Sequence, residues 1–191
     1  MIIITKFPTN ITEYAKLGKE NLFPTISGCK HCGFGGNLHR HCFYERNAIT
    51  PYEVFRIVIL RVKCPSCHKT HSIIPSFLIP YRQYTFEHIF LCLSYLYTRG
   101  YSYLSVLRVF RGLNPHTFFS IANVNHFKRR MIEVTPLVNY FFANFSDLYF
   151  DMAGYDTSSV VRKMELYISA HADFNLEYGS KMPIYFFKKV S

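Results

Sequence analysis

Four cysteines arranged as two Cys-x-x-Cys pairs are the residues of this sequence whose spacing best suits chemistry. Cys29 and Cys32 form the first pair, in the stretch CKHCG, and Cys64 and Cys67 form the second, in CPSCHK. Two thiolates separated by two residues fit on one tight turn, so each pair can supply half of a tetrahedron around one Zn²⁺ at about 2.3 Å per sulfur. The pattern therefore predicts one structural zinc site. The alternatives are disulfides or a chance spacing.

Residues 33–63 separate the two pairs, which is more than the roughly 15 to 20 residues of the usual pattern, but they divide into two strands and a loop. Several histidines lie close to the pairs: His31, His39, His41, His68 and His71. Because four thiolates complete a tetrahedral set, no histidine is needed and no coordination position is left open for catalysis. Replacement of one cysteine by a nearby histidine is the alternative ligand set. Cys42 and Cys92 are expected to be ordinary buried thiols.

The segments that must position the four cysteines are rich in aromatic and β-branched residues. Runs 38–46, 53–63 and 69–74 have the composition of strands, and the break at Thr50 and Pro51 predicts a hairpin between the first two. We therefore expect a three-stranded zinc ribbon over residues 29–80, supported by a strand and a short helix in residues 1–28. The basic residues of these strands are candidates for contacts with nucleic acid: Arg40, Arg46, Arg56, Arg61 and Lys63.

Helical periodicity begins after Pro80. Thr85 predicts the start of a helix that ends near residue 99, Ser102 the start of a second that ends near residue 112, and Pro115 the start of a third that runs to Arg130. Three helices with a short turn before the last are the outline of a helix-turn-helix domain, here over residues 84–130.

The third predicted helix carries the candidate base-reading residues. Its apolar positions, Phe118 and Ile121 among them, are expected to face the core. Asn123 can pair bidentately with adenine, and the basic end of the helix can contact phosphates. The predicted contacts are His116, Thr117, Ser120, Asn123, Lys128, Arg129 and Arg130. The alternative is a small helical bundle with a polar face and a basic last turn.

Positive charge is concentrated in the first two thirds of the chain. The 191 residues carry a formal net charge of +10, and Lys and Arg outnumber Asp and Glu in residues 1–130 but not in residues 131–191. A basic body of this kind favours an anionic partner, of which nucleic acid is the most common. The N-terminus has neither the charged nor the long apolar region of an export signal, and the apolar runs are shorter than a membrane span. We therefore expect a cytoplasmic protein with no membrane partner.

Residues 131–191 are predicted to form a helical tail of unknown role, with one helix from Pro136 to Phe145 and another near Ser158 to Ala170. Its aromatic residues are expected to pack on the preceding helices, with a dimer interface as the alternative: Tyr140, Phe141, Phe142, Tyr149 and Phe150. Its acidic residues match no spacing of a metal-dependent nuclease: Asp147, Asp151, Asp156, Glu165, Asp173 and Glu177. We expect solvated acids and no enzyme activity. The predicted fold class is thus α+β, with a small zinc ribbon, a helix-turn-helix domain and a helical tail.

The stretch RVKCPSCHKTHSIIPSFLIPYRQYT, preceded by CKHCG and HRHCFYERN and followed by the helix-turn-helix pattern, resembles a family of uncharacterised bacterial transposase-like proteins. These are similar to the N-terminal, DNA-end-binding portion of insertion-sequence transposases. The resemblance covers roughly residues 1–130. It implies zinc on the four cysteines of the two pairs and DNA binding through residues 115–130.

Together these features predict a zinc-stabilised DNA-binding protein that resembles the DNA-binding part of a transposase and lacks a catalytic domain of its own. RNA is an alternative partner, because a zinc ribbon with a basic surface serves either nucleic acid, and a homodimer is compatible with the sequence. Two other classes remain. One is a protein-interaction adaptor in which zinc only stabilises a small fold, and the other is a metal-dependent nuclease that uses the acids of the tail.

Overall fold

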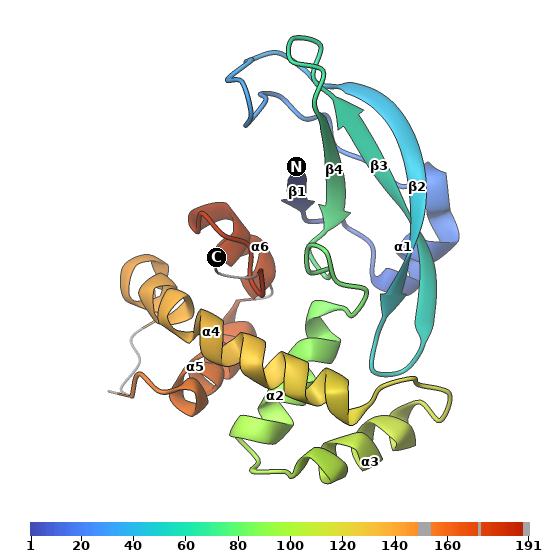
Figure 1. Ribbon diagram of the computed structural model, residues 1–191. Helices are drawn as coiled ribbons and strands as arrows, with labels where there is room; N and C mark the ends of the chain where they lie inside the picture. The colour runs from blue at the N-terminus through green and yellow to red at the C-terminus, as the bar shows by residue number, and fades with distance from the viewer. Residues whose placement is uncertain (149–153, 172, 189–191) are drawn as a thin grey trace.

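The computed structural model describes residues 1–148, 154–171 and 173–188. In these residues a four-stranded sheet lies beside a body of helices (Figure 1). The described part of the chain contains six α-helices. The mixed α+β class predicted from the sequence is confirmed at this level.

The predicted hairpin is the centre of the sheet. Strands β2 (His39–Ile49) and β3 (Val54–Lys63) pair antiparallel, and β4 (Thr70–Pro75) pairs antiparallel with β3. The turn forms where the sequence breaks: the hydroxyl of Thr50 accepts hydrogen bonds from the backbone N–H groups of Tyr52 and Glu53 at 3.2 and 3.0 Å. This short side-chain cap fixes the register of the hairpin.

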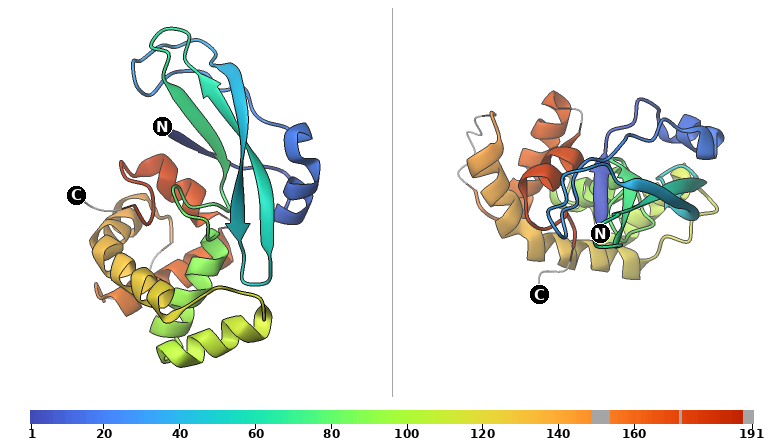
Figure 2. Two further views of the ribbon diagram at one scale, coloured as in Figure 1. Left: turned by 45° about the vertical axis from the view of Figure 1, so that its right-hand side comes forward. Right: turned by 90° about the horizontal axis from the view of Figure 1, so that it is seen from above.

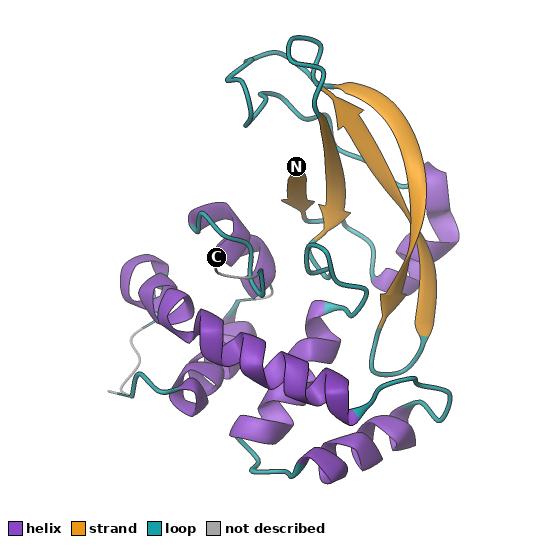
Figure 3. Cartoon of the chain, viewed as in Figure 1, coloured by secondary structure: helices purple, strands orange, loops and turns teal. Residues whose placement is uncertain are grey.

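A fourth strand corrects the prediction of a three-stranded ribbon. Strand β1 (Ile2–Thr5) pairs in parallel with β4, with Ile2 opposite Ser72, so the strand order is β1-β4-β3-β2 (Figure 3). Residues 1–28 therefore share one sheet and one hydrophobic core with residues 29–80. Parallel pairing of segments that lie about 70 residues apart leaves no local signal in the sequence, which is why the prediction missed it.

Helices α2 (Phe86–Tyr97) and α3 (Tyr103–Leu113) begin at their predicted caps. The side chain of Thr85 accepts from the N–H of His88, and that of Ser102 accepts from the N–H of Ser105. Both caps satisfy backbone donors that have no partner inside the helix. The chain then forms α4 (Ile121–Phe145), α5 (Thr157–Ala170) and α6 (Phe174–Lys181).

The start of α4 corrects the third predicted helix. The helix begins at Ile121 instead of Pro115, because Ser120 and Asn123 form a capping box: the hydroxyl of Ser120 accepts from the N–H of Asn123, and the side chain of Asn123 accepts from the N–H of Ser120. Residues 114–120 form the connection from α3, which is longer than the three- or four-residue turn of a helix-turn-helix.

The end of α4 also differs from the prediction of a new helix at Pro136. The helix continues through Pro136 to Phe145. Proline removes one backbone donor and costs helix stability, but Val134, Val138 and Phe141 are buried in the helical core on both sides of it. Burial of this apolar stripe holds the two halves in one helix.

Helix α1 (Ile11–Leu17) covers one face of the sheet and defines its sides. The amide oxygen of Asn10 accepts from the N–H of Glu13 at 2.9 Å and caps the helix, and a 3-10 turn (Gly18–Glu20) follows. The hydroxyl of Tyr14 donates to the carbonyl of Val58 at 2.8 Å. Figure 2 shows α1 on one side of the sheet and helices α4 to α6 on the other. We call the face under α1 the outer face and the opposite one the inner face.

The tail belongs to the helical core and also touches the sheet. Phe141 and Phe142 pack on Tyr167 and Phe174, so the predicted packing of the tail is confirmed for these residues. Tyr140 is largely exposed, and Tyr149 and Phe150 lie outside the described residues. The buried amide of Asn175 in α6 donates to the carbonyls of Ser76 and Leu78 at 2.6 and 2.8 Å. These bonds join the tail to the end of β4.

Within the described ranges, no helix has the length and apolar character needed to cross a bilayer.

Candidate metal centre and nucleic-acid interface

The two Cys-x-x-Cys turns bring four sulfur atoms together at the end of the sheet away from α4. The Sγ atoms of Cys29, Cys32, Cys64 and Cys67 all lie within 4.8 Å of one another. The pairs Cys29–Cys67 and Cys32–Cys64 are 3.7 and 3.8 Å apart. Four sulfurs held at about 2.3 Å from one tetrahedral ion lie about 3.8 Å from each other. The cluster therefore has the dimensions of a four-thiolate metal site, and no disulfide joins its members.

The two turns have the same backbone design. In the first, Gly33 has φ +75° and donates its N–H to the carbonyl of Cys29 at 2.9 Å. In the second, His68 has φ +59° and donates its N–H to the carbonyl of Cys64 at 3.0 Å. The residue after each pair thus adopts the left-handed conformation that closes the turn. His68 serves this backbone role and is not among the clustered ligand atoms.

The surroundings of the cluster shift the pKa values of two of its cysteines in opposite directions. The backbone N–H of Lys69 lowers the pKa of Cys67, but burial and the three other cysteines raise it to about 12. Burial raises the pKa of Cys29. Hydrogen bonds from the backbone N–H groups of His31 and Cys32 and from the ring of His71 have the larger, opposite effect and lower this pKa to about 5. Nε2 of His71, which is only 1 % exposed, lies 3.4 Å from Sγ of Cys29. A metal ligand is usually oriented by a neighbouring donor of this kind. His71 thus supports a ligand, and the four-cysteine set contains no histidine.

The two cysteines outside the cluster differ in burial. Cys92 is buried in α2, as predicted, and burial raises its pKa to about 12. Cys42 is exposed, which corrects the expectation of a buried thiol. It follows a register shift in β2, between Arg40 and Cys42, that places it at the edge strand of the sheet.

The sheet separates the five predicted basic residues onto two faces. Residues that are opposite each other in neighbouring strands share a face, and the register puts Arg46 opposite Ile57, and Arg61 opposite Ser72, on the inner face. Lys63 is on the same face, opposite Thr70. The other two are on the outer face. Arg40 donates to the carbonyl of Phe23 at 3.5 Å, and Arg56 pairs with Glu45 at 2.6 Å.

The predicted contacts of the third helix are also divided. His116 and Thr117 lie in the connection 114–120, outside the helix. Ser120 and Asn123 bond each other in the capping box, and Lys128 lies over the ring of Tyr103 at 5.4 Å. Arg129 and Arg130 follow on α4, with Arg129 exposed and Arg130 donating to Glu133.

The orientation of Phe118, next to these residues in the chain, differs from the prediction. Phe118 was expected in the core, but it is 95 % exposed, and Phe119 is the buried residue. Because residues 114–120 are not helical, the period of 3.6 used for the prediction does not apply there. Ile121 is likewise about half exposed.

Two cavities share Tyr81: the smaller lies on the inner face of the sheet, and the larger lies between α4 and Asn47, Ile49 and Val54 at the turn end of the β2–β3 hairpin. One, of about 350 Å³, is lined by Tyr44, Arg46 and Arg61 of the sheet and by Tyr81 of the loop before α2. The other, of about 630 Å³, is lined by Tyr81 and Arg82 and by Asn123 and His126 of α4. Both have Tyr81 in their walls, and neither is lined by a carboxylate among the described residues. We call the following set the basic surface: Tyr44, Arg46, Arg61, Tyr81, Arg82, His126, Arg129 and Arg130.

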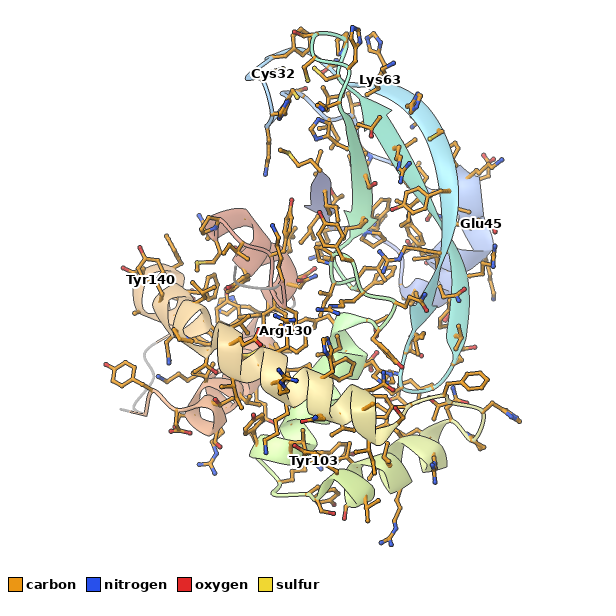
Figure 4. All side chains as sticks on the ribbon, in the orientation of Figure 1. Cys32, Glu45, Lys63, Tyr103, Arg130 and Tyr140 are labelled. Carbon is orange, nitrogen blue, oxygen red and sulfur yellow. The ribbon has the colours of Figure 1, made fainter. Side chains whose placement is uncertain are left out.

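Arg130 lies close enough to Arg82 and His126 to shift the pKa values of both. The pKa of His126 is lowered, first by burial and then by the charges of Arg82 and Arg130, while Glu133, the ion-pair partner of Arg130, opposes the shift. Burial and Arg130 also lower the pKa of Arg82. Cations that lower one another's pKa values create a positive potential that attracts an anion. Figure 4 places Arg130 on α4 and Cys32 and Lys63 at the end of the sheet away from it.

Sequence reasoning missed four members of the basic surface: Tyr81, Arg82, Tyr44 and His126. The stretch YRQY at residues 81–84 interleaves aromatic and basic residues, which is a signal of nucleic-acid contact that could have found the first two. His126 carries no such signal, because only the packing of α4 against the loop brings it to Arg82.

The acids of the tail have structural partners in most cases. Asp156 and Asp173 cap α5 and α6, and Glu165 accepts from Ser94 and Thr98. Asp147 lies 3.0 Å from His171, in a cavity of about 580 Å³ that Glu177 also lines. Asp151 lies outside the described residues. Apart from the four cysteines, the described residues contain no group of metal-ligating side chains.

A comparison with protein families matches one segment of the chain. A family model described as a domain of unknown function (DUF6431) matches residues 29–99. This segment contains both Cys-x-x-Cys turns, strands β2 to β4 and helix α2. No curated protein and no solved structure matches the chain.

Proposed function

We propose that this protein binds DNA through the basic surface and that a zinc ion on the four cysteines stabilises the end of the sheet. The observation that carries the proposal is that the two cavities share Tyr81, so that Arg46 and Arg61 of the sheet and Arg82 of the loop lie along walls that contain no carboxylate among the described residues. Backbone phosphates supply most of the affinity of nucleic-acid binding, and they require such a surface.

Zinc is the proposed metal because of the ligand set. Four thiolates in a tetrahedron suit Zn²⁺ or iron, and a closed set of four leaves a structural role. The sulfur separations of 3.7 and 3.8 Å fit such an ion without rearrangement of the turns. Purified protein should contain about one zinc per chain by elemental analysis, and the metal content identifies iron if it is the ion instead.

Duplex DNA is the proposed partner because the cationic residues come from three parts of the fold: α4, the loop before α2 and the sheet. Arg129 and Arg130 on α4 and Arg82 on the loop can contact phosphates of one strand, while the arginines of the inner face extend the contact toward the sheet. The resemblance to the DNA-end-binding portion of insertion-sequence transposases supports the same partner. In this proposal the α4 residues position the duplex, and Asn123, which is bonded to Ser120, is not a base-reading residue.

The test is the salt dependence of duplex binding, measured by fluorescence anisotropy. Log affinity should fall linearly with log salt, with a slope of about −0.9 for each phosphate that is neutralised. Arg82→Gln and Arg129→Gln should each reduce the magnitude of the slope by about one and weaken binding severalfold.

Lys16→Gln is the matched control. Lys16 is exposed on α1, which covers the outer face, so this variant has the same change of charge but should bind as the wild type does. Equal losses in all three variants would indicate that only the net charge matters. Failure to bind any duplex at low salt would contradict the proposal and favour the adaptor, in which the metal only stabilises the fold.

A further inference from the structure

The smaller of the two cavities has features that a purely electrostatic surface does not need. Its walls combine two arginines, Arg46 and Arg61, with two tyrosines, Tyr44 and Tyr81, and with the hydroxyl residues Thr70 and Ser72. Its volume of about 350 Å³ lies in the range of small-molecule sites. Aromatic rings beside guanidinium groups are the combination that binds a base together with its phosphate.

Tyr81 occupies a backbone position that tyrosine rarely adopts. It has φ +64°, and the N–H of Arg82 donates to the carbonyl of Ile79 at 3.1 Å, so Pro80 and Tyr81 are the central residues of a tight turn. The second central residue of such a turn is usually glycine or asparagine, because a side chain is strained at positive φ. Strain of this kind persists mainly at functional sites.

The packing of Tyr81 does not account for the strain. The ring is 68 % exposed, and none of the ring pairs found among the described residues includes it. Its position in the walls of both cavities instead leaves one aromatic face free for a ligand.

The two arginines that line the cavity are placed where they can bind an anion. Arg61 lies 4.6 Å from the ring centre of Tyr44, which holds its planar guanidinium along the wall. Arg46 is half-buried on the inner face, and burial lowers its pKa. Within the described parts of the chain Arg46 has no ion pair. A cation that is partly removed from water and has no carboxylate partner is stabilised when a phosphate binds beside it.

We propose that this cavity binds one unpaired nucleotide of a DNA strand, with the base against Tyr81 and Tyr44 and the phosphate on Arg46 and Arg61. A base inside a duplex is stacked on both sides and cannot offer its face to a protein ring, whereas an unpaired base can. The inference rests on the proposed DNA binding and extends it: the preferred DNA has a duplex part for α4 and a single-stranded extension for the inner face.

The experiment compares a blunt duplex with the same duplex carrying a single-stranded extension that contains 2-aminopurine. Wild-type protein should bind the extended DNA roughly tenfold more tightly, the size expected for stacking of one base, and should quench the 2-aminopurine. Tyr81→Gly should remove the quenching and should lower the ratio of the affinities for the extended and the blunt DNA to about one. Because glycine relieves the strain at positive φ, the same variant should melt at an equal or higher temperature.

The outcomes separate the inference from the function on which it rests. Equal affinity of the wild type for the two DNAs, or a preference that survives in Tyr81→Gly, would overturn the nucleotide site and leave duplex binding intact. Binding of neither DNA at low salt would overturn both. Arg46→Gln provides a second variant with an unchanged turn, and it should lose the preference for the extension, whereas Lys16→Gln on the outer face should keep it.

Discussion

His88 gives a prediction whose size follows from the structure. This residue of α2 is fully buried, and its ring packs against Tyr84, Phe110 and Phe119. Neither ring nitrogen has a hydrogen-bond partner of good geometry among the described residues. Burial lowers the pKa of His88 from 6.5 to about 4, although the nearby backbone of Thr50 opposes the shift. The folded protein therefore holds a neutral imidazole at a site where the charged form is strongly disfavoured.

The direction of the pH effect follows from proton uptake on unfolding. Between pH 6.5 and about 4 the unfolded chain binds a proton at His88 that the folded chain does not bind, so the contribution of His88 to stability is fully present above pH 6.5 and is lost as the pH falls toward 4. With these two pKa values, acidification from about pH 7.5 to about pH 5.5 should cost about 1.4 kcal/mol through this residue alone. His88→Phe should remove this loss.

Urea unfolding of wild type and His88→Phe, followed by circular dichroism at the two pH values with zinc present, measures the effect. The packing cost of the larger ring is independent of pH, so the relevant quantity is the change with pH in the difference between the two unfolding free energies. His88→Leu, with a different shape and no titrating group, should show the same change. If the difference between variant and wild type is equal at both pH values, then His88 does not remain neutral in the folded protein and the reasoning fails.

Three further predictions concern the metal, the tail and the capping box. Cys64→Ser should lose most of the bound zinc and unfold the two Cys-x-x-Cys turns, as measured by metal analysis and hydrogen exchange, whereas Cys42→Ser, at an exposed cysteine outside the cluster, should retain the metal. Asn175→Ala leaves two buried carbonyls without their donor and should reduce the unfolding free energy by about 2 kcal/mol, while Asn144→Ala, at an exposed position of α4, should cost much less. Asn123→Ala removes the side chain that accepts from the N–H of Ser120 in the capping box, so it should cost about 1 kcal/mol of stability and leave the ratio of specific to non-specific DNA affinity unchanged in anisotropy measurements.

Local sequence patterns predicted most of the secondary structure. Thr85 and Ser102 marked the starts of two helices because a cap is a bond between a side chain and a backbone N–H three residues away. Alternation placed Arg56 and Arg61 on opposite faces of β3, since successive side chains of a strand point to opposite sides. The four-cysteine cluster was predictable for the same reason, because each Cys-x-x-Cys pair needs only one short turn.

The predicted helix starts at Pro115 and Pro136 were both wrong. Pro115 and Pro136 are both acceptable first residues of a helix. However, α4 starts at Ile121, where Ser120 and Asn123 form the capping box, and it runs through Pro136 because the buried stripe of Val134, Val138 and Phe141 is continuous. A proline costs a few kcal/mol within a helix at most, and burial of several large side chains offsets that cost.

The sequence by itself predicted most of the elements, the two Cys-x-x-Cys turns and the excess of positive charge, since each depends on residues close together in the chain. Only the tertiary structure decided that β1 completes the sheet, that α6 joins the tail to β4 through Asn175, and which arginines share a face with α4. It also brought Tyr81 between the sheet and the helices, in the walls of both cavities. The physical reason is that these contacts join segments separated by tens of residues. Their formation depends on how the apolar faces of the whole chain pack against one another, and no short window of sequence encodes that packing.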